Sequence, residues 1–197
     1  MKNPTPVTIG LRSKTGRAIA VVLGTDAGSL KVFRKLEVKL TDPRIPATAQ
    51  PYHAVMDLPW PESQKAARGS VRAIEAVARQ ALARLIKEMQ AEGLMVEGAG
   101  VIGSPDRDLA RIGNYHIRAH AAEGILFRRV LELAAEANGL PARAFSEPAL
   151  EQAAAAELRT SPAKLKQTLS DLGRALDPPW RTDEKQAALA AWLMLRK

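Results

Sequence analysis

The chain has 197 residues, of which 46% are hydrophobic and 25% charged, a composition typical of a folded domain and not of a disordered or fibrous protein. It contains no cysteine, which excludes disulfides, a thiol nucleophile and cysteine-ligated zinc or iron–sulfur sites. No apolar run approaches the roughly 20 residues of a membrane helix, and the first residues lack the apolar stretch of a signal peptide. We therefore expect one domain over residues 1–197, in the cytoplasm and without a membrane partner.

Positive charge is concentrated near the start of the chain. The formal net charge is +8, and residues 1–50 hold nine Lys and Arg against three Asp and Glu. A localised basic surface favours a phosphate-bearing partner, so nucleic acid is the expected partner. The alternative is a role in solubility, because Lys31, Lys35 and Lys39 recur at even spacing in an expected strand, where charge blocks unwanted sheet pairing.

The first 40 residues have the pattern of three strands. Hydrophobic residues alternate over 7–12 and 30–39, and residues 18–23 form a continuous apolar run typical of a strand buried on both faces. Glycine-containing turns separate the three segments, which predicts an antiparallel meander with 30–39 at its edge. Five prolines within residues 41–62 then predict a long loop.

Helices and strands alternate after this loop. The pattern predicts helices over 62–92 and 114–138, each followed by a strand, at 98–103 and 142–147. Further helices are expected at 148–158, 162–176 and 183–196. Because strands linked by helices run parallel, this order predicts an α/β fold with a mixed five-stranded sheet flanked by helices, its first three strands antiparallel. That is the ribonuclease H-like arrangement.

Two parts of the sequence sharpen this prediction. Residues 9–21, IGLRSKTGRAIAV, resemble the first hairpin of RuvC-type junction resolvases. Residues 161–167, SPAKLKQ, lead through Pro178-Pro179-Trp180 to residues 183–191, DEKQAALAA, and are similar to the end of RuvC, where a lysine-bearing helix precedes a last helix with an Asp-x-x-Asp-Ala-Leu pattern. The resemblance covers nearly the whole chain. It implies a nucleic-acid-associated protein whose candidate phosphate contacts are Arg12, Lys14, Arg17, Lys164 and Lys166.

The same resemblance indicates where a two-metal site would lie in this chain. The family uses clustered carboxylates to hold two divalent metals, so it implies Mg²⁺ or Mn²⁺ as the cofactor of any catalysis here. In this chain the family's first-strand Asp falls on Arg12, the Glu that closes its fourth strand falls near Gly103 or Ser104, and the second Asp of its last helix falls on Gln186. Asp183 matches the first Asp of that helix, but acids in a first helical turn are also favoured by the helix dipole. We therefore expect the two-metal nuclease activity to be missing.

A second group of candidate residues lies at the start of the helix over 114–138. His116, His120 and Glu123 recur at i, i+4 and i+7, so they share one face of the helix. Two imidazoles and a carboxylate could bind a transition metal with open positions. With Arg118 and the helix N-terminus, they could instead hold a phosphate while a histidine acts as general base. The structural alternative is a set of hydrogen-bonded polar residues at a helix start.

Three functions remain open at this stage. The leading interpretation is a nucleic-acid-associated protein of RuvC-like fold without two-metal cleavage. The second is an active metal-dependent or histidine-dependent nuclease or phosphohydrolase whose site is rebuilt from His116, His120, Glu123 and Asp183. The third is a scaffold or interaction module without catalysis, since a fold does not fix a function. A cluster of carboxylates in space would favour an enzyme, and a basic groove without one would favour binding.

Overall fold

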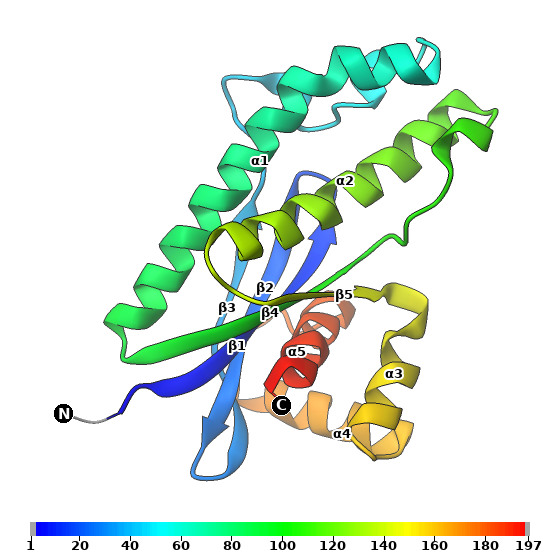
Figure 1. The fold of residues 1–197 in the computed structure, drawn as a ribbon. Coiled ribbons are helices and arrows are strands. Elements are labelled where there is room, and N and C mark those ends of the chain that lie inside the picture. The colour runs from blue at the N-terminus through cyan, green and yellow to red at the C-terminus, as the bar shows by residue number, and fades with distance from the viewer. Residues whose placement is uncertain (1–2, 196–197) are drawn as a thin grey trace.

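The computed structural model describes residues 3–195, and five strands in it form one mixed sheet in the order β3-β2-β1-β4-β5 (Figure 1). The strands are β1 (Thr5–Lys14), β2 (Arg17–Asp26), β3 (Ser29–Lys39), β4 (Leu94–Gly103) and β5 (Ala142–Ser146). The first three pair antiparallel, β4 lies beside β1 and parallel to it, and β5 lies parallel to β4. The predicted meander and the parallel pairing across β1 are thus confirmed.

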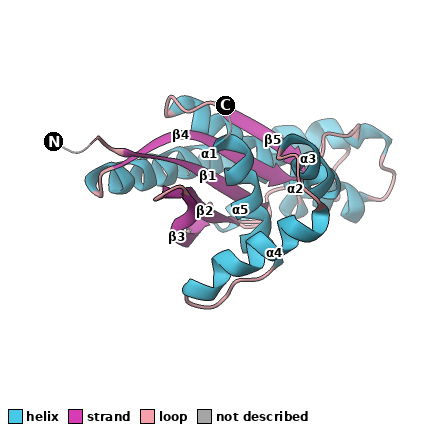
Figure 2. Ribbon diagram, turned by 90° about the horizontal axis from the view of Figure 1, so that it is seen from below, coloured by secondary structure: helices cyan, strands magenta, loops and turns pink. Residues whose placement is uncertain are grey.

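Helices cover both faces of this sheet. They are α1 (Trp60–Ala91), α2 (Tyr115–Ala137), α3 (Leu150–Glu157), α4 (Pro162–Leu172) and α5 (Thr182–Leu195). Figures 1 and 2 show α1 and α2 against one face and α3, α4 and α5 against the other. No helix among residues 3–195 has both the length and the apolar character needed to cross a bilayer.

Alternation along the central strands divides the core in two. Successive strand residues point to opposite faces, so the buried Val7, Ile9 and Leu11 of β1 pack into the cluster under α1 and α2. On the other face, Val21 and Ile102 pack with the apolar side chains of α3, α4 and α5. The continuous apolar run over residues 18–23 follows from this arrangement, because β2 contributes to both clusters.

Two glycines let α5 approach the centre of the sheet. A Cβ added to Gly10 of β1 would lie 1.7 Å from the carbonyl oxygen of Ala187, and one added to Gly100 of β4 would lie 2.6 Å from that of Ala190. On its side facing the sheet, α5 carries alanines at these positions. Thr8 Oγ1 donates a hydrogen bond of 2.7 Å to the carbonyl of Ala191. This close packing fixes α5 along its own axis and so fixes where its first turn lies.

The proline-rich loop is anchored at both of its ends. It contains two short 3₁₀ turns, Pro46–Thr48 and His53–Val55. The hydroxyl of Thr48 accepts from the backbone N–H of Asp42, and hydrogen bonds from Arg44 lower the pKa of the Asp42 carboxyl to about 2. The backbone of Tyr52 is held from α2, as described below. The loop therefore reaches across to α2.

Replacing Gly10 by alanine tests the helix–sheet contact. The Gly10→Ala variant should lose about 3 kcal/mol of unfolding free energy, because the new methyl group meets the backbone of α5 and a helix cannot yield as a flexible side chain does. Urea denaturation followed by circular dichroism measures the change. Gly69→Ala is the matched control: Gly69 is exposed on α1, and an added Cβ would meet no atom within 4 Å apart from its chain neighbours and the backbone of its own helix, so this variant should gain up to about 1 kcal/mol. Equal stability of the two variants would contradict the packing argument.

Candidate functional site

A compact group of charged residues lies where β1 ends against the first turn of α5. Arg12 is only 8% exposed, and its guanidinium donates a hydrogen bond of 2.5 Å to Glu147 Oε2. Asp183 Oδ1 lies 3.5 Å from Arg12 Nε and 3.0 Å from Lys14 Nζ. We call these four residues the Arg12 cluster. Its two carboxylates are balanced by its two cations.

The fold brings the cluster together from three separate elements. Arg12 lies on the same face of β1 as Gly10, two residues earlier, so the approach of α5 at Gly10 delivers Asp183 to it. Glu147 follows β5 directly, and β5 is parallel to β4 and hence to β1, so all three strands end at the same edge of the sheet. The sequence pattern indicated Arg12, Lys14 and Asp183, but it missed Glu147, which carries no periodic signal.

A second buried arginine closes the opposite face of the same sheet edge. Arg128 of α2 donates to the carbonyl of Ser104 at 2.8 Å and to Asp106 at 2.6 Å. A Cβ added at Gly103 would lie 2.3 Å from Ser13 Oγ and 2.8 Å from Arg128 Cβ. The end of β4 therefore has no room for a larger side chain unless Ser13 and Arg128 shift.

Two glutamates of equal exposure test whether the burial of Arg12 matters. Glu147 and Glu37 are both 47% exposed, but Glu147 pairs with the buried Arg12 whereas Glu37 pairs with the half-exposed Arg17. Glu147→Ala should cost about 2 kcal/mol of unfolding free energy, because it leaves a buried guanidinium with Asp183 as its remaining acidic partner. Glu37→Ala should cost about 0.5 kcal/mol, as is usual for a surface pair. Chemical denaturation measures both values, and equal losses would show that the pairing at Arg12 contributes no more than a surface contact.

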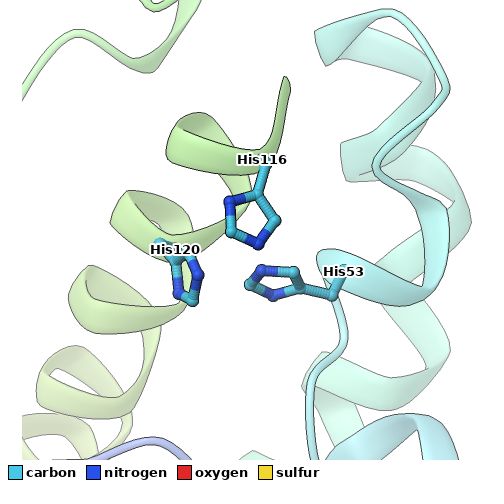
Figure 3. A group of neighbouring side chains, drawn as sticks. All are labelled: His53, His116 and His120. Carbon is cyan, nitrogen blue, oxygen red and sulfur yellow. The ribbon is translucent and has the colours of Figure 1, made fainter. Parts of the chain in front are cut away.

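Three histidines form a second group, far from the first in sequence (Figure 3). His116 and His120 project from the first turns of α2, and His53 faces them from the 3₁₀ turn of the proline-rich loop. The ring centroid of His53 lies 5.2 Å from that of His116 and 4.3 Å from that of His120. One ring nitrogen from each histidine lies within 4.8 Å of the others. Sequence reasoning missed His53, since nothing in a loop of prolines indicates which way one side chain points.

Glu123 lies behind these histidines and is fully buried. Its Oε1 accepts hydrogen bonds from the backbone N–H groups of Tyr52 and His53, at 3.2 and 3.1 Å, and lies 2.9 Å from His53 Nδ1. Burial raises the pKa of the Tyr52 hydroxyl, and the negative charge of Glu123 raises it further. Glu123 thus shares a helix side with His116 and His120 but serves as the anchor of the loop that carries His53.

The remaining candidate residues lie apart from one another. Arg118 is buried, donates to the carbonyl of Leu58 at 3.1 Å and stacks over the ring of Tyr115. Lys166 lies 3.9 Å from Glu151, while Lys164 is exposed and has no ion pair with any residue in the described part of the chain. Several cations of the first 50 residues pair with carboxylates: Arg17 with Glu37, Lys31 with Asp26, Arg34 with Glu88 and Glu92, and Arg44 with Asp42.

Comparison with solved structures relates the fold to one group of proteins. The chain is similar to the Thermus thermophilus RuvC structure, with a TM-score of 0.49 and 17% identity over 95% of this chain and 92% of that one. It is also similar to T. thermophilus RuvC in complex with Holliday junction substrate, with a TM-score of 0.50 and 16% identity over 95% and 90% of the two chains. No protein-family model and no curated protein sequence matches it. At these identities the likeness is one of fold, and the predicted RuvC-like, ribonuclease H-like fold is confirmed.

Proposed function

We propose that this protein associates with nucleic acid through a RuvC-like domain and does not carry out two-metal phosphodiester cleavage. The fold supports the first part, because it is shared with a protein solved in complex with a Holliday junction substrate. The observation that carries the second part is the buried Arg12, which ion-pairs with Asp183 and Glu147 at the end of β1.

The residues at this sheet edge do not fit a pair of divalent metals. Such a pair needs several carboxylate oxygens in one place. By the resemblance to RuvC, the matching positions here are Arg12, Gly103 and Gln186, and the remaining Asp183 is already bound to Arg12 and Lys14. A unit positive charge about 4 Å from a cation costs about 4 kcal/mol at an effective dielectric of 20, roughly a thousandfold in affinity. Metal-dependent cleavage at this edge is therefore not part of the proposed function.

The exposed side of α1 is the surface we assign to phosphate contacts. Lys65, Arg68, Arg72 and Arg79 are exposed and recur at spacings of three, four and seven residues, so they lie along one side of the helix, interrupted by Glu75. None of these four cations has an ion pair with a residue among 3–195. Unpaired exposed cations can neutralise phosphates without first giving up a carboxylate, which distinguishes them from the paired cations of the first 50 residues.

Nucleic-acid binding should therefore depend on salt and on α1. Fluorescence anisotropy with duplex and four-way-junction DNA should show binding at low salt that weakens steeply as salt rises, by about 0.9 log units per phosphate neutralised for each tenfold rise in salt. Replacing Lys65, Arg68 and Arg72 together by alanine should reduce the slope of log affinity against log salt by about 2.7.

The control removes the same charge from cations that already have partners. Lys31, Arg111 and Arg174 are exposed and each pairs with an aspartate, so their joint replacement by alanine should leave most of the binding intact. An equal loss of DNA affinity in both triple variants would mean that binding depends on net charge and not on the cations of α1. If no DNA probe is bound at low salt, the proposed association with nucleic acid is wrong.

Four-way-junction cleavage tests the second part. With Mg²⁺ or Mn²⁺, the wild type and Asp183→Asn should both leave the junction intact over the time in which a resolvase cuts it. Metal-dependent cutting that Asp183→Asn abolishes would show that the Arg12 cluster opens to accept metals. Cutting abolished by His120→Ala alone would instead support the histidine-dependent hydrolase as the function.

A further inference from the structure

We propose that His53, His116 and His120 bind one Zn²⁺ ion, with Glu123 orienting His53 and a fourth coordination position left open. The proposal does not depend on the nucleic-acid function, because it rests on different residues. Among residues 3–195, the structure brings together one group of three metal-ligating side chains, and it is these histidines. One ring nitrogen of each lies within 4.8 Å of the others.

The geometry is close to that of a bound site. His116 and His120 stand one helical turn apart, a spacing that places two imidazoles side by side on one helix face. Zinc–nitrogen bonds of 2.0–2.1 Å in a tetrahedron put ligand nitrogens about 3.3 Å apart. The nitrogens here lie within 4.8 Å, and both helix histidines are exposed, so their side chains have room to rotate toward one ion.

Three buried polar atoms at the cluster lack a hydrogen bond. His53 Nδ1, His53 Nε2 and Glu123 Oε2 are inaccessible to solvent and have no hydrogen bond with the described residues, although Nδ1 lies 2.9 Å from Glu123 Oε1. Buried polar atoms are nearly always satisfied, so an orphaned imidazole nitrogen facing two further imidazoles indicates a missing ligand. The contact of His53 Nδ1 with Glu123 favours the tautomer that carries its proton on Nδ1 and leaves a lone pair on Nε2 for a metal.

The charge of Glu123 points to a cation in the same way. Its side chain is 1% exposed, and no Lys or Arg among residues 3–195 forms an ion pair with it. A carboxylate held away from water needs a compensating positive charge. A divalent ion bound to His53 Nε2 supplies that charge through the imidazole ring. This is the carboxylate–histidine–metal arrangement common in zinc proteins.

The donor set selects the kind of ion. Imidazole nitrogens suit zinc and neighbouring transition metals, whereas Mg²⁺ and Ca²⁺ require oxygen ligands. The cluster offers three protein ligands, the number found in zinc sites that keep a position for water or substrate. Because His116 and His120 are exposed, that position faces solvent.

Metal titration of the full chain tests the proposal. After treatment with a chelator, the protein should take up one equivalent of Zn²⁺ in competition with a chromophoric indicator, and Co²⁺ should give the visible absorption of a four-coordinate site. Zn²⁺ should raise the melting temperature, since a ligand that binds only the folded state stabilises it, and Mg²⁺ should not. His120→Ala should weaken Zn²⁺ binding by more than about 100-fold, since losing a ligand exceeds the 10–100-fold effect of an outer partner.

Two further variants separate metal binding from a structural role. Glu123→Gln keeps the shape of the buried side chain and should weaken zinc by about 10–100-fold, while its melting temperature without metal shows whether it still folds. Glu136→Ala, at an exposed site near the far end of α2, should bind zinc like the wild type. The proposal is overturned if zinc is not bound stoichiometrically, if His120→Ala binds it undiminished, or if inorganic phosphate and not zinc stabilises the metal-free protein.

Discussion

The approach of α5 to the sheet through Gly10 and Gly100 is the constraint on which the rest of the structure depends. Helix backbone fills the space that two side chains would otherwise occupy, so α5 can neither slide nor rotate without a clash. Because the position of α5 is fixed, so is that of Asp183 in its first turn, and Asp183 meets Arg12. In this fold, packing at the centre of the sheet thereby decides the electrostatics at its edge.

Two buried arginines determine the charge balance at that edge of the sheet. Arg12 faces α5 and Arg128 belongs to α2 on the opposite face, and each is matched by two acidic side chains. An edge neutralised in this way gains rigidity but leaves little unpaired negative charge with which to attract a cation. His116 and His120 lie elsewhere on α2: His120 precedes Arg128 by eight residues, about 12 Å along the helix axis.

The sequence predicted what depends on local pattern. Alternation of hydrophobic residues placed β1 and β3, the apolar run placed β2 at an interior position, and the linking helices implied the parallel pairing. It also indicated His116 and His120, because a helix makes residues four apart neighbours. His53 and Glu147 escaped prediction, since each lies in or beside a short 3₁₀ turn, where no periodicity exists. Their partners are set by how whole elements dock, which no local window contains.

The tether between the proline-rich loop and α2 has a consequence for the order in which the protein folds. The hydrogen bonds from Tyr52 and His53 to Glu123 close chain segments of about 70 residues, so they can form only after α1 and β4 have brought α2 alongside. The tether acts together with the packing of Tyr52 on the core and the hydrogen bond from Arg118 to the carbonyl of Leu58, so the loop is held against α2 at more than one point. The histidine cluster therefore depends on contacts between segments about 70 residues apart, and its third imidazole comes from the loop and not from α2.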